Sequence, residues 1–234
     1  MKHMPLYVAL VLLAVTSASE AAADDGPGPF GVTVTAPATP ETARVGALFA
    51  GGEHFCTASV VDSPHRDLIV TAAHCLDGGS GELTFVPGYR NGRAPYGGWR
   101  VTRSYLPDGW DEDSDVAFAT VAGQRGAHLQ DLVGGNRFSP GTATGATAVT
   151  VTGYPAARET PLRCTDKPVA HSRTQQRVAC PDFSGGTSGS PWVNGDGDVV
   201  GVLGGHEQGG ATADVSYSVV LGAKAAELYR EAAN

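Results

Sequence analysis

A serine lies inside the glycine-rich loop Gly185-Gly186-Thr187-Ser188-Gly189-Ser190-Pro191. A serine hydroxyl is a poor nucleophile at its own pKa, so it needs a base to take its proton and N–H donors to stabilise the oxyanion that forms. Glycines on both sides permit backbone conformations that turn the N–H groups of Gly186 and Ser188 toward one point. The loop therefore predicts Ser188 as a nucleophile and Gly186 and Ser188 as an oxyanion hole. A plain Gly/Ser linker is the alternative, and the strand-like SPWVN directly after Gly189 disfavours it.

A histidine and an acid that could activate such a serine come earlier in the chain. His74 follows the apolar run 67–72, and a disulfide from the adjacent Cys75 would hold its imidazole rigidly, as a general base requires. Asp115 begins the strand-like run 115–121, so we expect it to be partly buried. The other acids between 108 and 113 lie in a Gly/Trp/Ser turn, where solvated acids are normal. We therefore predict His74 as the base and Asp115 as the carboxylate that orients it.

Four cysteines follow the first 50 residues, and each half of the chain holds one close pair. An even number of cysteines in an exported chain indicates disulfides, and four cysteines allow three pairings. The simplest pairing by spacing is Cys56 with Cys75 and Cys164 with Cys180. Zinc binding is the competing interpretation, but the sequence has no C-x-x-C and its histidines are not at ligand spacing. No metal and no other cofactor is expected.

The segments that must position these residues look like short strands joined by tight turns. The chain of 234 residues contains 32 glycines and 15 prolines, with many valines and threonines, which favours an all-β fold. Six apolar or alternating runs in the first half are enough for a small closed barrel. Periodicity alone leaves a barrel and a sandwich both open. The predicted strands are 44–49, 56–61, 67–72, 82–86, 99–106 and 115–121, then 147–154, 176–180, 190–194, 198–204 and 214–220, and 221–234 is expected to be a closing helix.

The N-terminal residues predict export. Residues 1–23 combine a short basic start, an apolar stretch over 5–15 and the small-residue end Ala21-Ala22-Ala23, which together are typical of a signal peptide. The apolar stretch is far shorter than the roughly 20 residues that span a bilayer, so a membrane anchor is disfavoured. Residues 24–43 are rich in Pro, Gly and Ala, and we expect an extended arm or a short pro-segment there. The mature protein is expected to be secreted, extracellular and free of the membrane.

At this point three motifs make a family resemblance plain. The segments TAAHC (71–75), DVAF (115–118) and GTSGSP (186–191), in that order, resemble those of the chymotrypsin/trypsin superfamily of serine peptidases. The order His, Asp, Ser differs from the orders found in subtilisins and α/β-hydrolases. The resemblance implies two six-stranded antiparallel barrels, a cleft between them and a C-terminal helix. It places the first barrel at about 44–122, the second at about 123–220 and the helix at 221–234, in one peptidase domain covering 44–234.

The sequence departs from the animal trypsin pattern at two places. The position before the nucleophile is Thr187 where that group has an Asp, and no IVGG-like start is present, so activation by a new N-terminus paired with that acid is excluded. In these features the chain looks more like bacterial extracellular members, including the glutamyl endopeptidase branch. That branch keeps a pocket histidine where this chain has Leu203.

Two residues are candidates for the substrate pocket. Asp182 lies six residues before Ser188, where the trypsin group carries its pocket acid, and would favour Lys or Arg; as an alternative it is an ordinary turn residue. His206 could neutralise a bound Glu, or it is a surface-loop histidine. Residue preference is left open.

These observations together predict a secreted serine endopeptidase that cleaves proteins or peptides through an acyl-enzyme. An exported esterase with the same triad and a catalytically silent binding protein on the same fold are the alternatives. The net charge of −8 disfavours binding to nucleic acid, whose phosphates an acidic surface repels. We expect a monomer.

Overall fold

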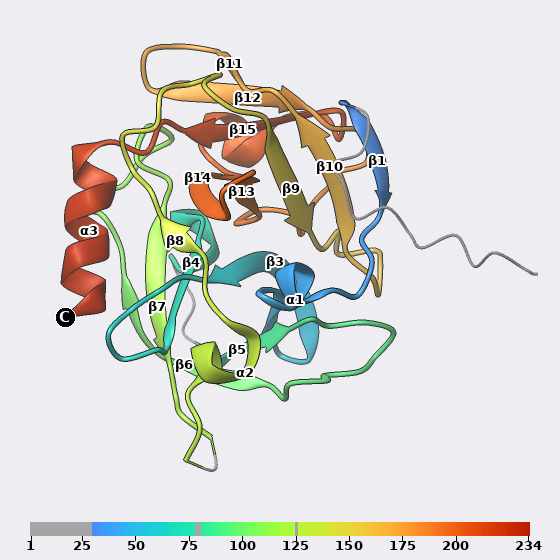
Figure 1. The fold of residues 1–234 in the computed structure, drawn as a ribbon, viewed down its shortest axis with the longest axis vertical. Coiled ribbons are helices and arrows are strands. Elements are labelled where there is room, and N and C mark those ends of the chain that lie inside the picture. The colour runs from blue at the N-terminus through green and yellow to red at the C-terminus, as the bar shows by residue number, and fades with distance from the viewer. Residues whose placement is uncertain (1–29, 78–80, 125) are drawn as a thin grey trace, which may run out of the picture.

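The structure is a computed structural model that describes residues 30–77, 81–124 and 126–234. The predicted signal peptide at 1–23 lies outside the described residues. The described chain is mostly β, with short helices and a longer helix at the C-terminus (Figure 1). None of the helices in this part of the chain is long and apolar enough to cross a membrane.

The six strands of the first half close into a barrel in the order β2-β3-β4-β7-β6-β5. This agrees with the six strands that the sequence predicts for this half. At one crossing of the barrel wall, a Cβ on Gly46 would lie 2.5 Å from the carbonyl oxygen of Val86, so only glycine lets β2 approach β5 this closely. The barrel strands are β2 (Val45–Ala50), β3 (Glu53–Val60), β4 (Leu68–Thr71), β5 (Leu83–Pro87), β6 (Trp99–Tyr105) and β7 (Ala117–Val121).

Within the described residues, the strands of the second half form two sheets and no closed ring, which corrects the prediction of two six-stranded barrels. Its strands form a six-stranded sheet, β1-β10-β9-β13-β14-β8, and a three-stranded sheet, β11-β12-β15. Apart from the short β8, they lie above the closed barrel in Figure 1. These strands are β1 (Val32–Thr35), β8 (Arg137–Phe138), β9 (Val149–Gly153), β10 (Leu162–Asp166), β11 (Val169–Ala170), β12 (Gln175–Ala179), β13 (Pro191–Asn194), β14 (Asp198–Val202) and β15 (Val215–Val219).

The two sheets of the second half meet at one end of β14 and β15: Leu203 and Ser218 form an isolated antiparallel bridge, and the Gly204 N–H donates to the Tyr217 carbonyl at 2.9 Å. Elsewhere between these strands, side chains bind the backbone. The hydroxyl oxygen of Ser218 accepts a hydrogen bond from the Val202 N–H at 2.9 Å. The Gln176 amide donates to the Val200 carbonyl at 3.3 Å. Because these backbone groups already have buried partners, a backbone ladder there is not needed to satisfy them.

Residues 30–43 pack on the folded domain through a strand and a short helix. The expected arm contains an extended stretch, β1. All four residues of β1 pair antiparallel with β10, so this stretch is part of a sheet. It then enters the one-turn helix α1 (Pro40–Ala43), which Thr39 caps through a reciprocal capping box with Thr42. The side chains of Thr42 and Ala43 are buried. Removing residues up to Glu41 would therefore remove a strand and a buried turn.

The C-terminal helix α3 (Ala223–Ala233) covers the junction of the two halves (Figure 1). Its buried face consists of Ala225, Leu228, Ala232 and Ala233, and these residues share one apolar cluster with Val70 and Phe118 of the barrel and with Val199 and Val219 of the second half. The helix thus fixes the two halves against one another. The remaining elements are the short helices η1 (Ala73–Cys75), α2 (Leu129–Val133) and η2 (His206–Gly209).

Replacing Phe118 by alanine is expected to lower the free energy of unfolding by about 3–5 kcal/mol. Phe118 is 0% exposed and packs edge-on against Phe138 with ring centroids 5.0 Å apart, so the substitution leaves a cavity that rigid neighbours cannot fill. Denaturant unfolding of the variant measures this loss. Phe30→Ala is the control, because that ring is 59% exposed and should cost under about 1 kcal/mol. A similarly small loss for Phe118→Ala would show that the interface is not tightly packed.

Candidate active site

His74 and Asp115 meet at the barrel edge through two hydrogen bonds. His74 lies in η1, which follows β4 directly, and Asp115 lies two residues before β7, the strand that pairs with β4. The imidazole Nδ1 of His74 is 2.7 Å from Asp115 Oδ2, and the backbone N–H of His74 donates to Asp115 Oδ1 at 3.0 Å. The carboxylate therefore holds the imidazole with Nδ1 as the donor and leaves Nε2 free to accept a proton.

Asp115 is buried, with 1% of its surface exposed, and stays ionised because of three donors. Burial raises the pKa of its carboxyl, but the hydrogen bonds from His74 and Gly205, together with attraction to the imidazolium form of His74, lower it by more, and the net pKa is lower than usual. The Gly205 N–H donates to Asp115 Oδ2 at 2.7 Å. A Cβ on the preceding Gly204 would lie 2.7 Å from the same oxygen. Only glycine at position 204 therefore lets this backbone approach the carboxylate so closely.

The loop of Ser188 docks directly on the first barrel. The Thr57 N–H of β3 donates to the Ser188 carbonyl at 2.7 Å, and the Thr57 hydroxyl donates to the Gly186 carbonyl at 3.0 Å. Gly189 has a φ of +86°, and a Cβ there would lie 2.0 Å from the Thr57 carbonyl oxygen. Glycine at this position is thus required both by the left-handed backbone and by the contact.

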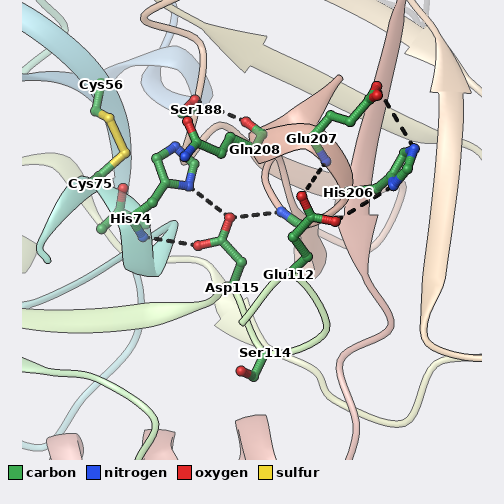
Figure 2. Close-up of polar contacts among 12 residues, drawn as sticks. Cys56, His74, Cys75, Glu112, Ser114, Asp115, Ser188, His206, Glu207 and Gln208 are labelled. Atoms are coloured by element: carbon green, nitrogen blue, oxygen red, sulfur yellow. Dashed lines mark hydrogen bonds and ion pairs between the residues drawn. A yellow bond between two sulfur atoms is a disulfide. The ribbon is translucent and has the colours of Figure 1, made fainter. Parts of the chain in front are cut away.

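Ser188 lies beside the His74 ring in Figure 2, but its hydrogen bond goes elsewhere. Its hydroxyl donates to the Gln208 carbonyl of η2 at 3.4 Å, and within the described residues no hydrogen bond joins Ser188 to His74. The structure thus pairs His74 with Asp115 and brings Ser188 next to them. The hydroxyl must give up its hydrogen bond to Gln208 before it can donate to His74 Nε2.

The two predicted oxyanion donors are available. Gly186 has a φ of +98°, a left-handed backbone that non-glycine residues rarely adopt. Among the hydrogen bonds of the described residues, none uses the N–H of Gly186 or of Ser188. Thr187 between them is 2% exposed, and its hydroxyl donates to the Ser184 carbonyl at 2.8 Å. Thr187 thus adds a hydrogen bond within the loop to the contacts that Thr57 makes with it, without an acid at position 187.

The disulfides are Cys56–Cys75 and Cys164–Cys180, the pairing that the spacing predicts. The first joins β3 to η1 and so anchors the turn that carries His74, as Figure 2 shows. Cys56, His74 and Cys75 also form the one group of potential metal ligands found among the described residues. Both of its sulfur atoms are in the disulfide, so this group lacks the thiolates that a metal ion would require.

Neither predicted pocket residue lines the cavity next to Ser188. That cavity has a volume of about 230 Å³ and lies between 183–188 and 203–213. Asp182 is exposed, with a φ of +70°, in the turn that follows the disulfide-bonded Cys180. His206 faces the other way, 3.7 Å from a Glu112 carboxylate oxygen and 3.8 Å from one of Glu207, with its ring against His171 and Tyr217.

Three residues of the site are missing from the sequence prediction. Gly205 and Thr57 act through backbone or hydroxyl hydrogen bonds over separations of 90 and 129 residues, and neither lies in one of the three motifs. Gln208 contacts Ser188 through its carbonyl, which any residue possesses. The cluster of glycines at 204, 205, 209 and 210 was the available signal that this loop approaches other backbone closely.

Solved structures of proteases share this fold. The chain is similar to the protease Anisep from Arthrobacter nicotinovorans, with 28% identity and a TM-score of 0.75, over 86% of this chain and 99% of that one. It is also similar to AL20, a thermostable serine protease from an extremophilic microorganism, with 24% identity and a TM-score of 0.74, over 83% and 99% of the two chains. A Glu endopeptidase structure matches with 18% identity and a TM-score of 0.71, over 88% and 98%. The fold is thus chymotrypsin-like.

A family model of the trypsin-like peptidase domain matches residues 56–202, more than half of the chain. The chain therefore belongs to the trypsin-like serine peptidase family, as the motifs indicated. Among proteins similar in sequence are the glutamyl endopeptidase of Bacillus licheniformis (33% identity over 53% of this chain) and an extracellular metalloprotease of Bacillus subtilis (28% over 58%). These matches span 41% and 45% of the two Bacillus proteins, so less than half of each relative is covered.

Proposed function

We propose that this protein is a secreted serine endopeptidase with His74, Asp115 and Ser188 as its catalytic triad. The observation that carries the proposal is the buried Asp115 carboxylate, which lies 2.7 Å from His74 Nδ1. The Ser188 loop lies beside this pair, and among the described residues the N–H groups of Gly186 and Ser188 have no hydrogen-bond acceptor. A binding protein on this fold has no need of an ionised, buried acid oriented toward a histidine.

The proposed reaction proceeds through an acyl-enzyme. The Ser188 Oγ attacks the substrate carbonyl carbon while His74 Nε2 takes the hydroxyl proton. The carbonyl oxygen becomes an oxyanion, which the N–H groups of Gly186 and Ser188 stabilise. His74 then gives its proton to the leaving amine, and the C–N bond breaks. Water, deprotonated by His74, attacks the ester, and the Ser188 oxygen leaves with that proton. Asp115 stays ionised throughout and stabilises the imidazolium.

Protein or peptide substrates are proposed on family membership. Secretion is supported by two disulfides, which form in oxidising compartments, and by the export signal predicted over 1–23. No cofactor, nucleic acid or membrane takes part in the proposed reaction, and the active unit is a monomer.

The purified protein is expected to react covalently with a fluorophosphonate probe and to digest casein. The probe measures an activated serine, and casein distinguishes a peptidase from an esterase acting on small esters. Mass spectrometry of the labelled protein should place the adduct on Ser188. Labelling without casein digestion would favour the esterase, whereas no labelling of folded protein would favour the silent binding protein and contradict the proposal.

A further inference from the structure

The cavity beside Ser188 has two buried apolar side chains, Phe183 and Leu203, among its lining residues. Its volume is about 230 Å³, and its lining combines apolar or small residues, including Phe183, Leu203, Ala211 and Ala213, with the uncharged polar residues Ser184, Thr187, Gln208 and Thr212. Phe183 and Leu203 are 5% and 3% exposed, so their side chains are packed and form a floor that does not open further. The rim next to the serine is the Gln208 carbonyl (Figure 2).

The two walls of this pocket are joined by backbone hydrogen bonds. The Phe183 N–H donates to the Ala213 carbonyl at 2.9 Å, and the Gly189 N–H donates to the Leu203 carbonyl at 2.7 Å. A Cβ on Gly209 would lie 2.5 Å from a methyl carbon of Leu203, which shows how closely the loop packs on the floor. Backbone hydrogen bonds therefore fix the position of the two walls relative to each other.

None of the residues that line this pocket has a charged side chain. Of the polar ones, Thr187 has its hydroxyl bound to the Ser184 carbonyl. The nearest acids along the chain are outside the lining: Asp182 and Asp214 are exposed, and the Glu207 carboxylate accepts from the Ala211 N–H and faces His206. A charged group that entered the pocket would lose water and find no opposite charge.

We propose that this pocket binds the side chain of the residue whose carbonyl is cleaved, and that it selects an uncharged, apolar side chain. The inference rests on the proposed function. During attack the carbonyl carbon must lie on Ser188 Oγ and its oxygen on the Gly186 and Ser188 N–H groups, so the side chain of the same residue enters the adjacent cavity. Leu203 and Phe183 are thus specificity-determining residues, and cleavage follows residues such as Leu, Met or Phe, and not Glu, Lys or Arg.

A library of fluorogenic peptides that differ only in the residue before the cleaved bond tests the inference on the full mature protein. We expect kcat/KM for Leu, Met or Phe at that position to exceed that for Glu, Lys and Arg by about 100-fold or more, the range that buried polar mismatch produces. A preference for Glu, Lys or Arg would overturn the inference.

Two variants of equal charge locate the selecting pocket. Ala213→Asp places a carboxylate in the lining, and Ala223→Asp places one on the exposed first residue of α3, away from the site. Relative to Ala223→Asp, we expect Ala213→Asp to raise the ratio of kcat/KM for Lys over Leu by about tenfold. Equal ratios in the two variants, each corrected for active sites by fluorophosphonate titration, would show that the side chain binds elsewhere.

The outcomes separate this inference from the proposed function. Folded wild-type protein that neither reacts with the probe nor cleaves any peptide contradicts the proposed function and the inference together. Protein that reacts with the probe and cleaves mainly after Glu, Lys or Arg contradicts the inference alone.

Discussion

Ser188→Ala is expected to lower kcat on a good peptide substrate by about 10⁶-fold and to leave the protein folded. The hydroxyl is the atom that forms the acyl-enzyme, and no other nucleophile takes its place. Its removal costs the fold little, because its hydrogen bond to the Gln208 carbonyl is long, at 3.4 Å, while the loop is fixed by Thr57 and by Thr187. Peptide hydrolysis and circular dichroism on the same preparation measure both effects.

Ser190→Ala is the matched control, since Ser190 is in the same loop and is the alternative nucleophile. Ser190 is 0% exposed, and its hydroxyl donates to the Thr187 carbonyl at 2.6 Å, so a substrate cannot reach it. We expect this variant to retain activity within about tenfold of wild type, a loss that reflects the removed hydrogen bond. If Ser190→Ala were inactive and Ser188→Ala active, the nucleophile would be Ser190.

Local sequence patterns could predict the first barrel because its strands are apolar runs separated by turn residues. The run 67–72 and the run 115–121, for example, become β4 and β7, which pair along their lengths. Strand β8 has two residues and β11 has two, too few for any periodicity, and β10 carries the mixed sequence LRCTD. An isolated bridge at Leu203 and Ser218 joins β14 to β15, and Gln176 and Ser218 bind nearby backbone through their side chains; only the tertiary structure determines these contacts.

The candidate site was predictable where one segment carries its own chemistry. The Ser188 loop and the His74–Cys75 turn are such segments, and Asp115 could be chosen among neighbouring acids because it directly precedes an apolar strand. The pocket could not be predicted in this way, because its lining comes from two separate segments of the chain. Asp182 illustrates the limit: its separation from Ser188 fits a pocket acid, but a turn with positive φ after Cys180 leaves it exposed.

Asp115→Asn is expected to lower kcat by about 10⁴-fold, the typical effect of this change in a Ser-His-Asp triad. The carboxylate accepts from His74 Nδ1 and Gly205 N at Oδ2, and from the His74 backbone N–H at Oδ1. An amide has only one acceptor oxygen, so in either orientation its NH₂ faces an N–H donor. The variant also lacks the negative charge that stabilises the imidazolium. Steady-state kinetics should show the loss in kcat, with KM changed little.

Asp113→Asn is the control for the loss of a nearby negative charge. Asp113 is exposed, and the hydrogen bonds from the Thr174 hydroxyl and the Gln175 amide lower its pKa. Among the hydrogen bonds and ion pairs of the described residues, none joins Asp113 to His74, and an asparagine could still accept both bonds through one oxygen. We expect this variant to keep kcat within about threefold of wild type, because an exposed charge is screened by solvent. A large loss in Asp113→Asn with full activity in Asp115→Asn would transfer the orienting role to Asp113. Equal, large losses in both would indicate that net charge in the 111–115 loop, and not the geometry of one carboxylate, supports His74.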